Sequence, residues 1–424
     1  MITQQIRRKH LVITSEQVIR FLLFLYLCGL NGHKSGVGFD AFFCRGTFVL
    51  LIGAEVIFSR KVILTSALKW YAGFIGLYFV SMLWSRDLDD LLSLAVLNSF
   101  IQIVGVIIVV GNHFHTRDDY EFGYKCLLWS VVYMCVLLIL RTPLNAWGSE
   151  RVGESIWLNP NSIGLRTSVG FILCLYFSKQ KKSYYFLAIA MGVIALLSGS
   201  RKAFIFILLE ITLFMLGKDN GWKTVLNICL VAIACGAIVY AVFNVPALYD
   251  VLGKRIEIFL ISSFGINVTH QYSMSVIDGS ADERAQLRQM AIQMFFERPI
   301  LGWGGNGFVT EMRRINFRHI VYSHCNYTEL LATLGVSGLL LYYWKPVVSL
   351  IRGTKFFFGN KDRLLLAALI VNAVYIVLDY YYVAYYDVFT LIVLTINISY
   401  IEYKFKYQSK NDENLKRFQG AYKG

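Results

Sequence analysis

Residues 322–344 read YSHCNYTELLATLGVSGLLLYYW, in which His324, Asn326, Thr328 and Glu329 open an otherwise apolar run. About 20 apolar residues are enough for a helix to cross the hydrocarbon core of a bilayer. Lipid tails offer polar side chains no hydrogen bonds, and a random membrane helix should not begin in this way. The polar opening therefore indicates that these side chains have partners or a function.

The whole chain has the composition of a membrane protein. Of its 424 residues, 56% are hydrophobic and only 16% are charged, and the mean hydropathy is +0.54. A soluble protein of this size could not cover so much apolar surface. The apolar runs predict an all-α polytopic membrane protein with about 12 transmembrane helices, centred near residues 24, 50, 73, 101, 131, 170, 191, 209, 233, 334, 372 and 395.

The basic residues predict how the chain is oriented. If the N-terminus is cytoplasmic, the inner loops and the tail from Lys404 hold 22 Lys and Arg, whereas the short outer loops hold 6. The positive-inside rule then places both termini in the cytoplasm. No small-residue cleavage site follows QQIRRKH (4–10), so the first span is expected to stay in the cytoplasmic membrane as an anchor. Basic loops facing anionic lipid explain the net charge of +14 without a nucleic-acid partner.

Loop lengths divide the chain into four predicted parts. These are an N-terminal transmembrane bundle (1–244), one large extracytoplasmic loop (245–321), the C-terminal spans (322–403) and a cytoplasmic tail (404–424). Long, patterned loops in compact bundles are usually functional.

The large loop contains a predicted amphipathic helix. In ADERAQLRQMAIQMFFE (281–297), apolar residues recur at helical spacing and Arg284 and Arg288 fall on the other side. Such a helix is expected to lie along the outer membrane surface. Pro299 and the run GWGGNG (302–307) are expected to end the helix in a flexible hinge.

Three polar clusters are expected at the outer face. They are NPNSIGLR (159–166), LSGSRKAF (197–204), and Arg284 and Arg288 together with SHCNYTE (323–329). Arg201 in the second cluster is unusual because the positive-inside rule disfavours arginine there. It is either a helix-end residue that snorkels or a group that binds an anion, for which guanidinium is well shaped.

These residues resemble the superfamily of O-antigen ligases and bacterial polysaccharide polymerases. In that family an Arg in the large loop precedes a Pro-(hydrophobic)₂-Gly-x-Gly turn by about fifteen residues, and a His-Asn-type pair then opens a span with a Gly further along it. The NPN segment and the GSR turn are also similar to family features. The corresponding residues here are Arg284, Pro299, Ile300, Leu301, Gly302, Gly304, His324 and Gly335, with Cys325 inserted before Asn326.

The resemblance implies a fold like that of the GT-C glycosyltransferases and a donor glycan on undecaprenyl pyrophosphate at the outer leaflet. It also implies a glycan acceptor, contact with membrane lipids, an association with a chain-length regulator, and no cofactor. A polymerase of O-antigen or capsule repeat units is the favoured reading. The alternative is a ligase that transfers polymer to lipid A core, both reactions belonging to the biosynthesis of lipopolysaccharide or other cell-envelope polysaccharide.

Residue chemistry assigns candidate roles in such a transfer. Arginine side chains stabilise the growing charge of a leaving pyrophosphate, which favours Arg284, then Arg201 and Arg288. A histidine, with an ordinary pKa of about 6.5, can accept the proton of an attacking hydroxyl, which favours His324 as general base. Supporting roles are expected for Asn161, Ser200, Asn326 and Glu329.

Other readings of these residues stay open. His324 could merely open a helix that Ser323 caps, and Glu329, about 140° around a helix from His324, is expected to orient a different group. Outer-loop carboxylates do not cluster, which predicts a metal-independent, inverting single displacement. The outer aromatic residues are either platforms for sugars or an ordinary interfacial belt, namely Trp147, Trp157, Trp303, Tyr322 and Tyr327.

A second class of protein, a polysaccharide flippase or permease, also competes. Ionisable residues inside apolar spans often mark transport paths, and five occur here: Arg45, Glu55, Lys69, Glu210 and Asp379. The halves of the chain show no internal repeat of the kind common in transporters. The gathering of polar clusters at one face favours an enzyme.

Overall fold

The structure, a computed structural model, describes seven long stretches of the chain and a few residues between 226 and 268. The stretches are residues 14–33, 37–85, 94–143, 152–198, 201–216, 279–317 and 322–421. All regular secondary structure in these residues is helical, as the sequence predicts. Two short 3-10 helices, η1 (Ser81–Trp84) and η3 (Glu154–Ile156), accompany the α-helices.

The α-helices follow the apolar runs of the sequence. They cover each predicted span centre except that near residue 233, in a stretch of which only single residues are described. Their bounds are α1 Ser15–Gly32, α2 Phe39–Phe58, α3 Ser66–Val80, α5 Leu94–His113, α6 Arg117–Arg141, α7 Pro160–Phe177, α8 Ser183–Leu197, α9 Arg201–Leu216, α13 Gly279–Glu297, α14 Gly307–Arg314, α15 Asn326–Asn360, α16 Arg363–Leu378 and α17 Val388–Ala421.

Five helices of the described chain are long and apolar enough to cross a membrane. They contain Phe39–Phe58, Val96–His113, Arg117–Arg141, Asn326–Asn360 and Val388–Lys406, and α8, α9 and α16 hold shorter apolar segments. Large apolar side chains on α2 remain exposed, as expected for a lipid-facing surface, among them Val49, Leu50, Val56 and Ile57. An all-helical membrane architecture is therefore confirmed, while the number of twelve spans and their orientation stay predictions.

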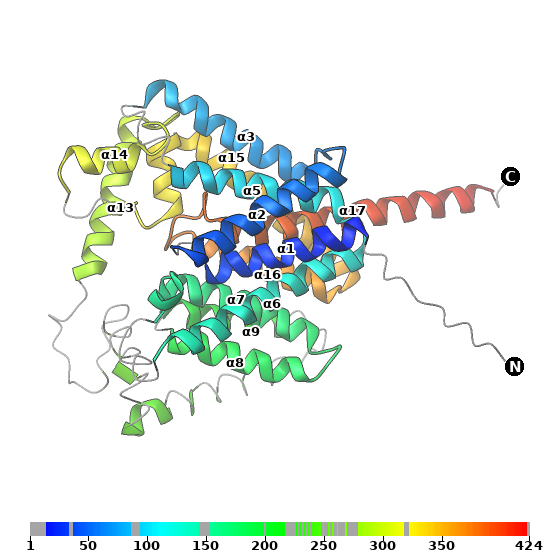
Figure 1. The fold of residues 1–424 in the computed structure, drawn as a ribbon, viewed down its shortest axis with the longest axis horizontal. Coiled ribbons are helices and arrows are strands. Elements are labelled where there is room, and N and C mark those ends of the chain that lie inside the picture. Colours follow the sequence, from blue (N-terminus) through cyan, green and yellow to red (C-terminus); the bar gives the residue numbers. More distant parts are fainter. Residues whose placement is uncertain are drawn as a thin grey trace, which may run out of the picture.

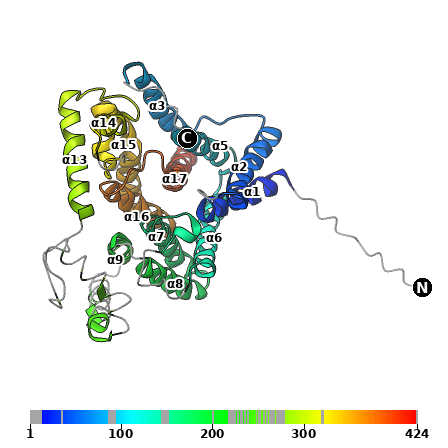
Figure 2. The same ribbon diagram turned by 60° about the vertical axis from the view of Figure 1, so that its left-hand side comes forward.

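The helices form a bundle with two distinct ends. Figure 1 shows α13 and α14 lying across one end, which we call the capped end, whereas α17 runs out of the other. In Figure 2, α13, α14 and α15 lie side by side along one edge of the molecule. The start of α15 lies beside the loop that joins α16 to α17, because Asn326 N donates to Asp379 O over 2.6 Å. This places the residues before α15 at the capped end.

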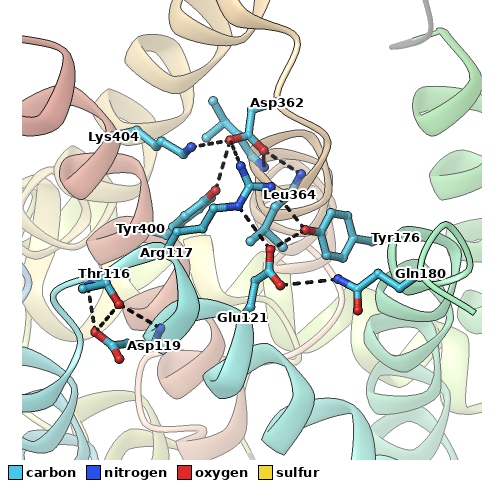
Figure 3. Close-up of polar contacts among 11 residues, drawn as sticks. Thr116, Arg117, Asp119, Glu121, Tyr176, Gln180, Asp362, Leu364, Tyr400 and Lys404 are labelled. Carbon is cyan, nitrogen blue, oxygen red and sulfur yellow. Dashed lines mark hydrogen bonds and ion pairs between the residues drawn. The ribbon is translucent and has the colours of Figure 1, made fainter. Parts of the chain in front are cut away.

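A polar cluster just beyond the C-terminal end of α15 joins α6, α7, α16 and α17, the contact with α7 being that of Arg117 with Tyr176 (Figure 3). We call this the opposite end, because α15 begins at the capped end. Asp362, the N-cap of α16, accepts from Lys404 Nζ at 2.5 Å and from Tyr400 at 3.2 Å, and lies 3.7 Å from Arg117. Burial raises the pKa of Asp362, but the hydrogen bond and charge of Lys404 and the charge of Arg117 outweigh it, so the pKa lies below its usual value.

The boundary predicted at residue 404, between the last span and a cytoplasmic tail, falls within one helix and stays a prediction. Helix α17 continues from Val388 to Ala421 without a break. Lys404 belongs to the bundle through its bond to Asp362. The predicted tail therefore begins as part of the last helix.

Candidate functional site

Helix α13 is amphipathic, as predicted, but its apolar side faces protein. Leu287, Ala291 and Met294 are buried against residues of the following turn, of α14 and of α15. A separate small core forms there, around Trp303, Phe308, Met312 and Ala332. The rest of the chain covers these apolar side chains, while Ile292 and Phe296 of the same helix stay exposed; that the helix lies along the outer membrane surface stays a prediction.

The turn after α13 is fixed to the middle of α15 by four backbone hydrogen bonds. Trp303 N and Gly304 N donate to Ala332 O and Thr333 O at 2.9 and 2.8 Å. In the other direction, Val336 N and Ser337 N donate to the carbonyl oxygens of residues 299 and 300 at 2.8 and 3.2 Å. We call residues 299–304 with 332–337 the glycine joint.

Two glycines make this close approach possible. Gly335 has φ 65° and ψ −161° and interrupts α15, and Gly302 has φ 64°. A Cβ on Gly335 would lie 2.4 Å from Ile300 O, and one on Gly302 would lie 2.4 Å from Thr333 O. Residues 302–305 are also buried. The expectation of a flexible hinge in GWGGNG is therefore wrong at its start, because backbone bonds and burial fix that part of the run.

His324 lies in a short extended segment before α15 and not within the helix. Its φ of 59° is the left-handed conformation, which is uncommon for a residue other than glycine and is found at strained functional positions. Its ring lies 4.6 Å from that of Tyr322, centroid to centroid, and the side chain is half-buried. The angle of about 140° between His324 and Glu329 does not apply, because the helix begins only at Asn326.

Glu329 holds this segment from inside the bundle. Its buried carboxylate accepts a hydrogen bond from Ser323 N at 2.6 Å. Ser323 Oγ donates to Cys325 O at 2.9 Å. The N-cap position of α15 is Cys325, without a side-chain hydrogen bond, so the reading of Ser323 as the cap is corrected. Glu329 and Ser323 instead fix the backbone on both sides of His324.

Asn326 is a buried connector. Its Oδ1 accepts from Ala384 N at 2.8 Å and Tyr385 N at 3.1 Å, and its Nδ2 donates to Tyr343 Oη at 2.8 Å and Asp379 Oδ2 at 3.2 Å. No part of the side chain is exposed. The expected supporting role is a structural one, because Asn326 joins the histidine segment to the loop between α16 and α17.

Two of the predicted arginines lie on α13 beside this segment. Arg284 lies in the first half of α13, which packs against α15. The guanidinium of Arg288, one helical turn further on, lies 5.4 Å from the ring centre of Tyr380. Burial raises the pKa of Tyr322, and the charge of Arg284 opposes that rise. The structure thus brings Arg284, Arg288 and His324 to one end of the bundle.

For the remaining predicted residues the structure gives less. Asn161 lies in the first turn of α7, Arg201 begins α9 with a side chain outside the described part, and Ser200 also lies outside the described residues. From the same NPNSIGLR segment, Arg166 is buried and donates to Leu30 O and Asn31 Oδ1, both at 2.9 Å. That buried charge holds α7 against α1, a role that the sequence pattern did not reveal.

The aromatic residues proposed as sugar platforms divide into three groups. Trp303 is buried, with Nε1 donating to Met294 O, and Tyr327 has one ring face stacked on Tyr343 at a centroid distance of 4.7 Å. Trp157 is exposed and Tyr322 is half-buried beside the histidine. Trp147 lies outside the described residues.

The ionisable residues of the transport reading do not form a common path. Arg45 and Lys69 are exposed. Glu55 is buried with Asn112 at 2.7 Å and His113 at 2.9 Å, which confirms that it is paired. Each remaining buried carboxylate has partners of its own on other helices, namely Ser168 for Glu210 and Tyr343 and Asn326 for Asp379.

The fold and the position of the site define an integral membrane protein of the multi-pass, all-helical class. Residues 186–343 match the family model described as O-antigen ligase. This range contains α13, the glycine joint and the histidine segment, and the match confirms the resemblance to the O-antigen ligase and polymerase superfamily. No curated protein matches the sequence.

In the described residues no group of three or more His, Cys, Asp or Glu side chains could hold a metal ion. Metal independence stays a prediction to be tested by chelation.

Proposed function

We propose that the protein is a glycosyltransferase that polymerises O-antigen or capsule repeat units. It would transfer a glycan from undecaprenyl pyrophosphate onto a lipid-linked repeat unit at the outer face of the bacterial cytoplasmic membrane. The observation that supports the proposal is that α13, which carries Arg284 and Arg288, contacts the loop that also binds the segment of His324, within the range matched by the O-antigen ligase family model.

The arrangement suits a displacement at the sugar carbon that bears the pyrophosphate. The acceptor hydroxyl attacks this carbon. The bond between the carbon and the pyrophosphate oxygen breaks, and the configuration at the carbon is inverted. His324 takes the hydroxyl proton, and Arg284 and Arg288 bind the pyrophosphate as its negative charge grows. Preorganised cations at a developing charge are usually the largest catalytic contribution. Glu329 and Ser323 contribute by fixing the backbone around the base.

The distribution of basic loops, which predicts cytoplasmic termini, also supports an orientation with the capped end at the outer face of the membrane. The cluster of Arg117, Lys404 and Asp362 lies beyond the C-terminal end of α15, whereas His324 precedes the N-terminal end of that helix. If that end faces the cytoplasm, the capped end meets the outer leaflet, where lipid-linked glycans and membrane lipids are both present. A chain-length regulator would then have access to the same surface.

A ligase is the second candidate because the matching family model carries that description. The two reactions share the donor and differ in the acceptor. The site residues would have the same roles in polymerisation and in ligation. Only the glycan products distinguish the two reactions.

A glycan gel of cells carrying His324→Ala in place of the wild-type protein tests the proposal. Loss of the ladder, with a single repeat unit left on its carrier or on lipid A, is expected for a polymerase. A ladder that persists on undecaprenyl pyrophosphate but never reaches its final acceptor means a ligase. An unchanged surface ladder contradicts both and favours a flippase.

His115→Ala is the matched control, because His115 is exposed and lies at the opposite end, beside Asn112. Equal expression of both variants has to be confirmed. In reconstituted protein, activity that is lost in EDTA and returns with magnesium would refute the metal-independent mechanism.

A further inference from the structure

The loop between α16 and α17 presents two exposed tyrosines at the capped end. Residues 379–387 read DYYYVAYYD, and Tyr380 and Tyr381 are 48% and 44% exposed, whereas Tyr385 is buried. The two exposed rings are perpendicular, with 5.0 Å between their centres and an angle of 89°. They form an aromatic corner.

The aromatic corner stands on a fixed loop. Tyr381 N donates to Leu378 O at 2.7 Å, and Tyr382 Oη is bonded to Thr390 Oγ1 at 3.0 Å. Further along, Ala384 N is held by Asn326 Oδ1. Because the loop is already fixed, a ligand that stacks on these rings immobilises few additional rotatable bonds of the protein. The entropic cost of binding is therefore low.

The aromatic corner borders the candidate site. Arg288 lies over Tyr380, and Arg284 is one turn away on the same helix, a rise of about 6 Å. The ring of Tyr322 contacts His324, and Asn326, at the start of α15, is bonded to Asp379 next to Tyr380. The proposed base, the two arginines and the exposed tyrosines thus lie together at the capped end.

We propose that Tyr380 and Tyr381 form a glycan-binding subsite that stacks a pyranose ring of the lipid-linked substrate. The C–H groups on a pyranose face carry partial positive charge, and the face of an aromatic ring is negative. Tyrosine hydroxyls and the neighbouring Arg288 can also bond sugar hydroxyls. An isoprenoid tail uses neither of these polar groups, which favours the glycan over the lipid part as the ligand. This inference rests on the proposed function.

The test measures binding of a lipid-free ligand. The probe is the repeat-unit oligosaccharide released from its carrier by mild acid, titrated calorimetrically into purified full-length protein in nanodiscs. The double variant Tyr380→Ala/Tyr381→Ala is expected to bind about tenfold more weakly, the order of loss that removal of a stacking ring causes. The double Phe variant keeps both rings and is expected to lose less than the Ala variant.

Two controls separate this subsite from the rest of the protein. Tyr185→Ala removes a similarly exposed ring from α8, away from the site, and should bind as wild type. His324→Ala should also bind the oligosaccharide while losing transfer, which separates binding from chemistry.

Three results would overturn the inference in distinguishable ways. Equal binding by the Ala double variant and the wild type excludes the subsite alone, provided that His324→Ala still abolishes the ladder. A loss of affinity for undecaprenyl phosphate with unchanged oligosaccharide binding assigns the rings to the lipid. Absence of oligosaccharide binding in the wild type, together with an intact ladder in His324→Ala, overturns both this inference and the proposed function.

Discussion

Substitution of Gly335 by alanine tests whether the glycine joint sets the geometry of the site. Gly335 has φ 65° and ψ −161°, a region essentially restricted to glycine. An alanine Cβ would lie 2.4 Å from Ile300 O, 2.5 Å from Ile300 C and 2.7 Å from Pro299 O. All three atoms belong to the backbone, so the turn itself has to move away from α15.

The expected cost has two parts. Holding a non-glycine residue in such a conformation costs about 1–3 kcal/mol. Moving the turn also breaks the bonds from Val336 N and Ser337 N to Pro299 and Ile300, each worth about 0.5–1.5 kcal/mol net. Together these give a loss of about 2–6 kcal/mol in the free energy of unfolding.

The effect on transfer should exceed the effect on folding. The joint fixes α13, which carries Arg284, against α15, which follows His324. A misplacement of about 1 Å between reacting groups can reduce a rate about a hundredfold. We therefore expect cells with Gly335→Ala to lose the glycan ladder even where the membrane still contains the protein.

The assay compares Gly335→Ala with Gly192→Ala in α8, where a Cβ meets nothing within 4 Å. The control should be neutral or slightly stabilising, because alanine favours helix over glycine by up to about 1 kcal/mol. Thermal unfolding midpoints in detergent and glycan ladders at matched expression are both measured. If both variants match the wild type in both measurements, the argument from the joint is refuted. A lowered midpoint with a full ladder would refute only its effect on the site.

Three further predictions concern the arginine, the buried connector and the cluster at the opposite end. Arg284→Lys should reduce transfer by purified protein at least tenfold, since a point charge cannot bind two phosphate oxygens as a guanidinium does, while exposed Arg60→Lys should be neutral; equal rates would contradict this. Asn326→Ala leaves two buried N–H groups without an acceptor, at about 1–3 kcal/mol each, and should lower the unfolding midpoint and remove the ladder; an unchanged midpoint would contradict it. Asp362→Asn should lower the midpoint at neutral pH while transfer per folded molecule stays unchanged. Because the pKa of Asp362 is depressed, its stabilisation is present at neutral pH and lost as the pH falls through the acidic range; the midpoint of the variant should therefore fall less on acidification than that of the wild type.

The helices could be predicted from the sequence because the signal for them is local. A run of about twenty apolar residues identifies a span without knowledge of its neighbours. Gly335 was named only through the family resemblance, and the break that it makes in α15 was not predicted. What the sequence could not give was the partner of that glycine, the carbonyl of Ile300, which is reached only after α13 docks.

The errors at the site have a common cause. Helical periodicity assigns an apolar side to α13 but does not say whether lipid or protein covers it, and α15 and α14 cover it here. The angle assigned between His324 and Glu329 assumed a continuous helix, although His324 adopts a left-handed conformation outside it. Exposure of Tyr380 and burial of Trp303 likewise depend on tertiary contacts, which residue type alone does not reveal.

The match to the O-antigen ligase family ends at residue 343, and this boundary separates two proposed tasks. The groups proposed for charge stabilisation and proton transfer all precede it, whereas the aromatic corner follows it. Tyr343 itself donates to Asp379 Oδ2 at 2.5 Å, and Asn326 bonds both residues. The two regions are therefore mechanically coupled although they are separate in sequence. Substitutions at the exposed positions 380 and 381 are expected to alter the preferred glycan and, at Tyr380, to remove a contact of Arg288. The buried bonds of Asn326 and Asp379 hold the loop beside His324 independently of those two side chains.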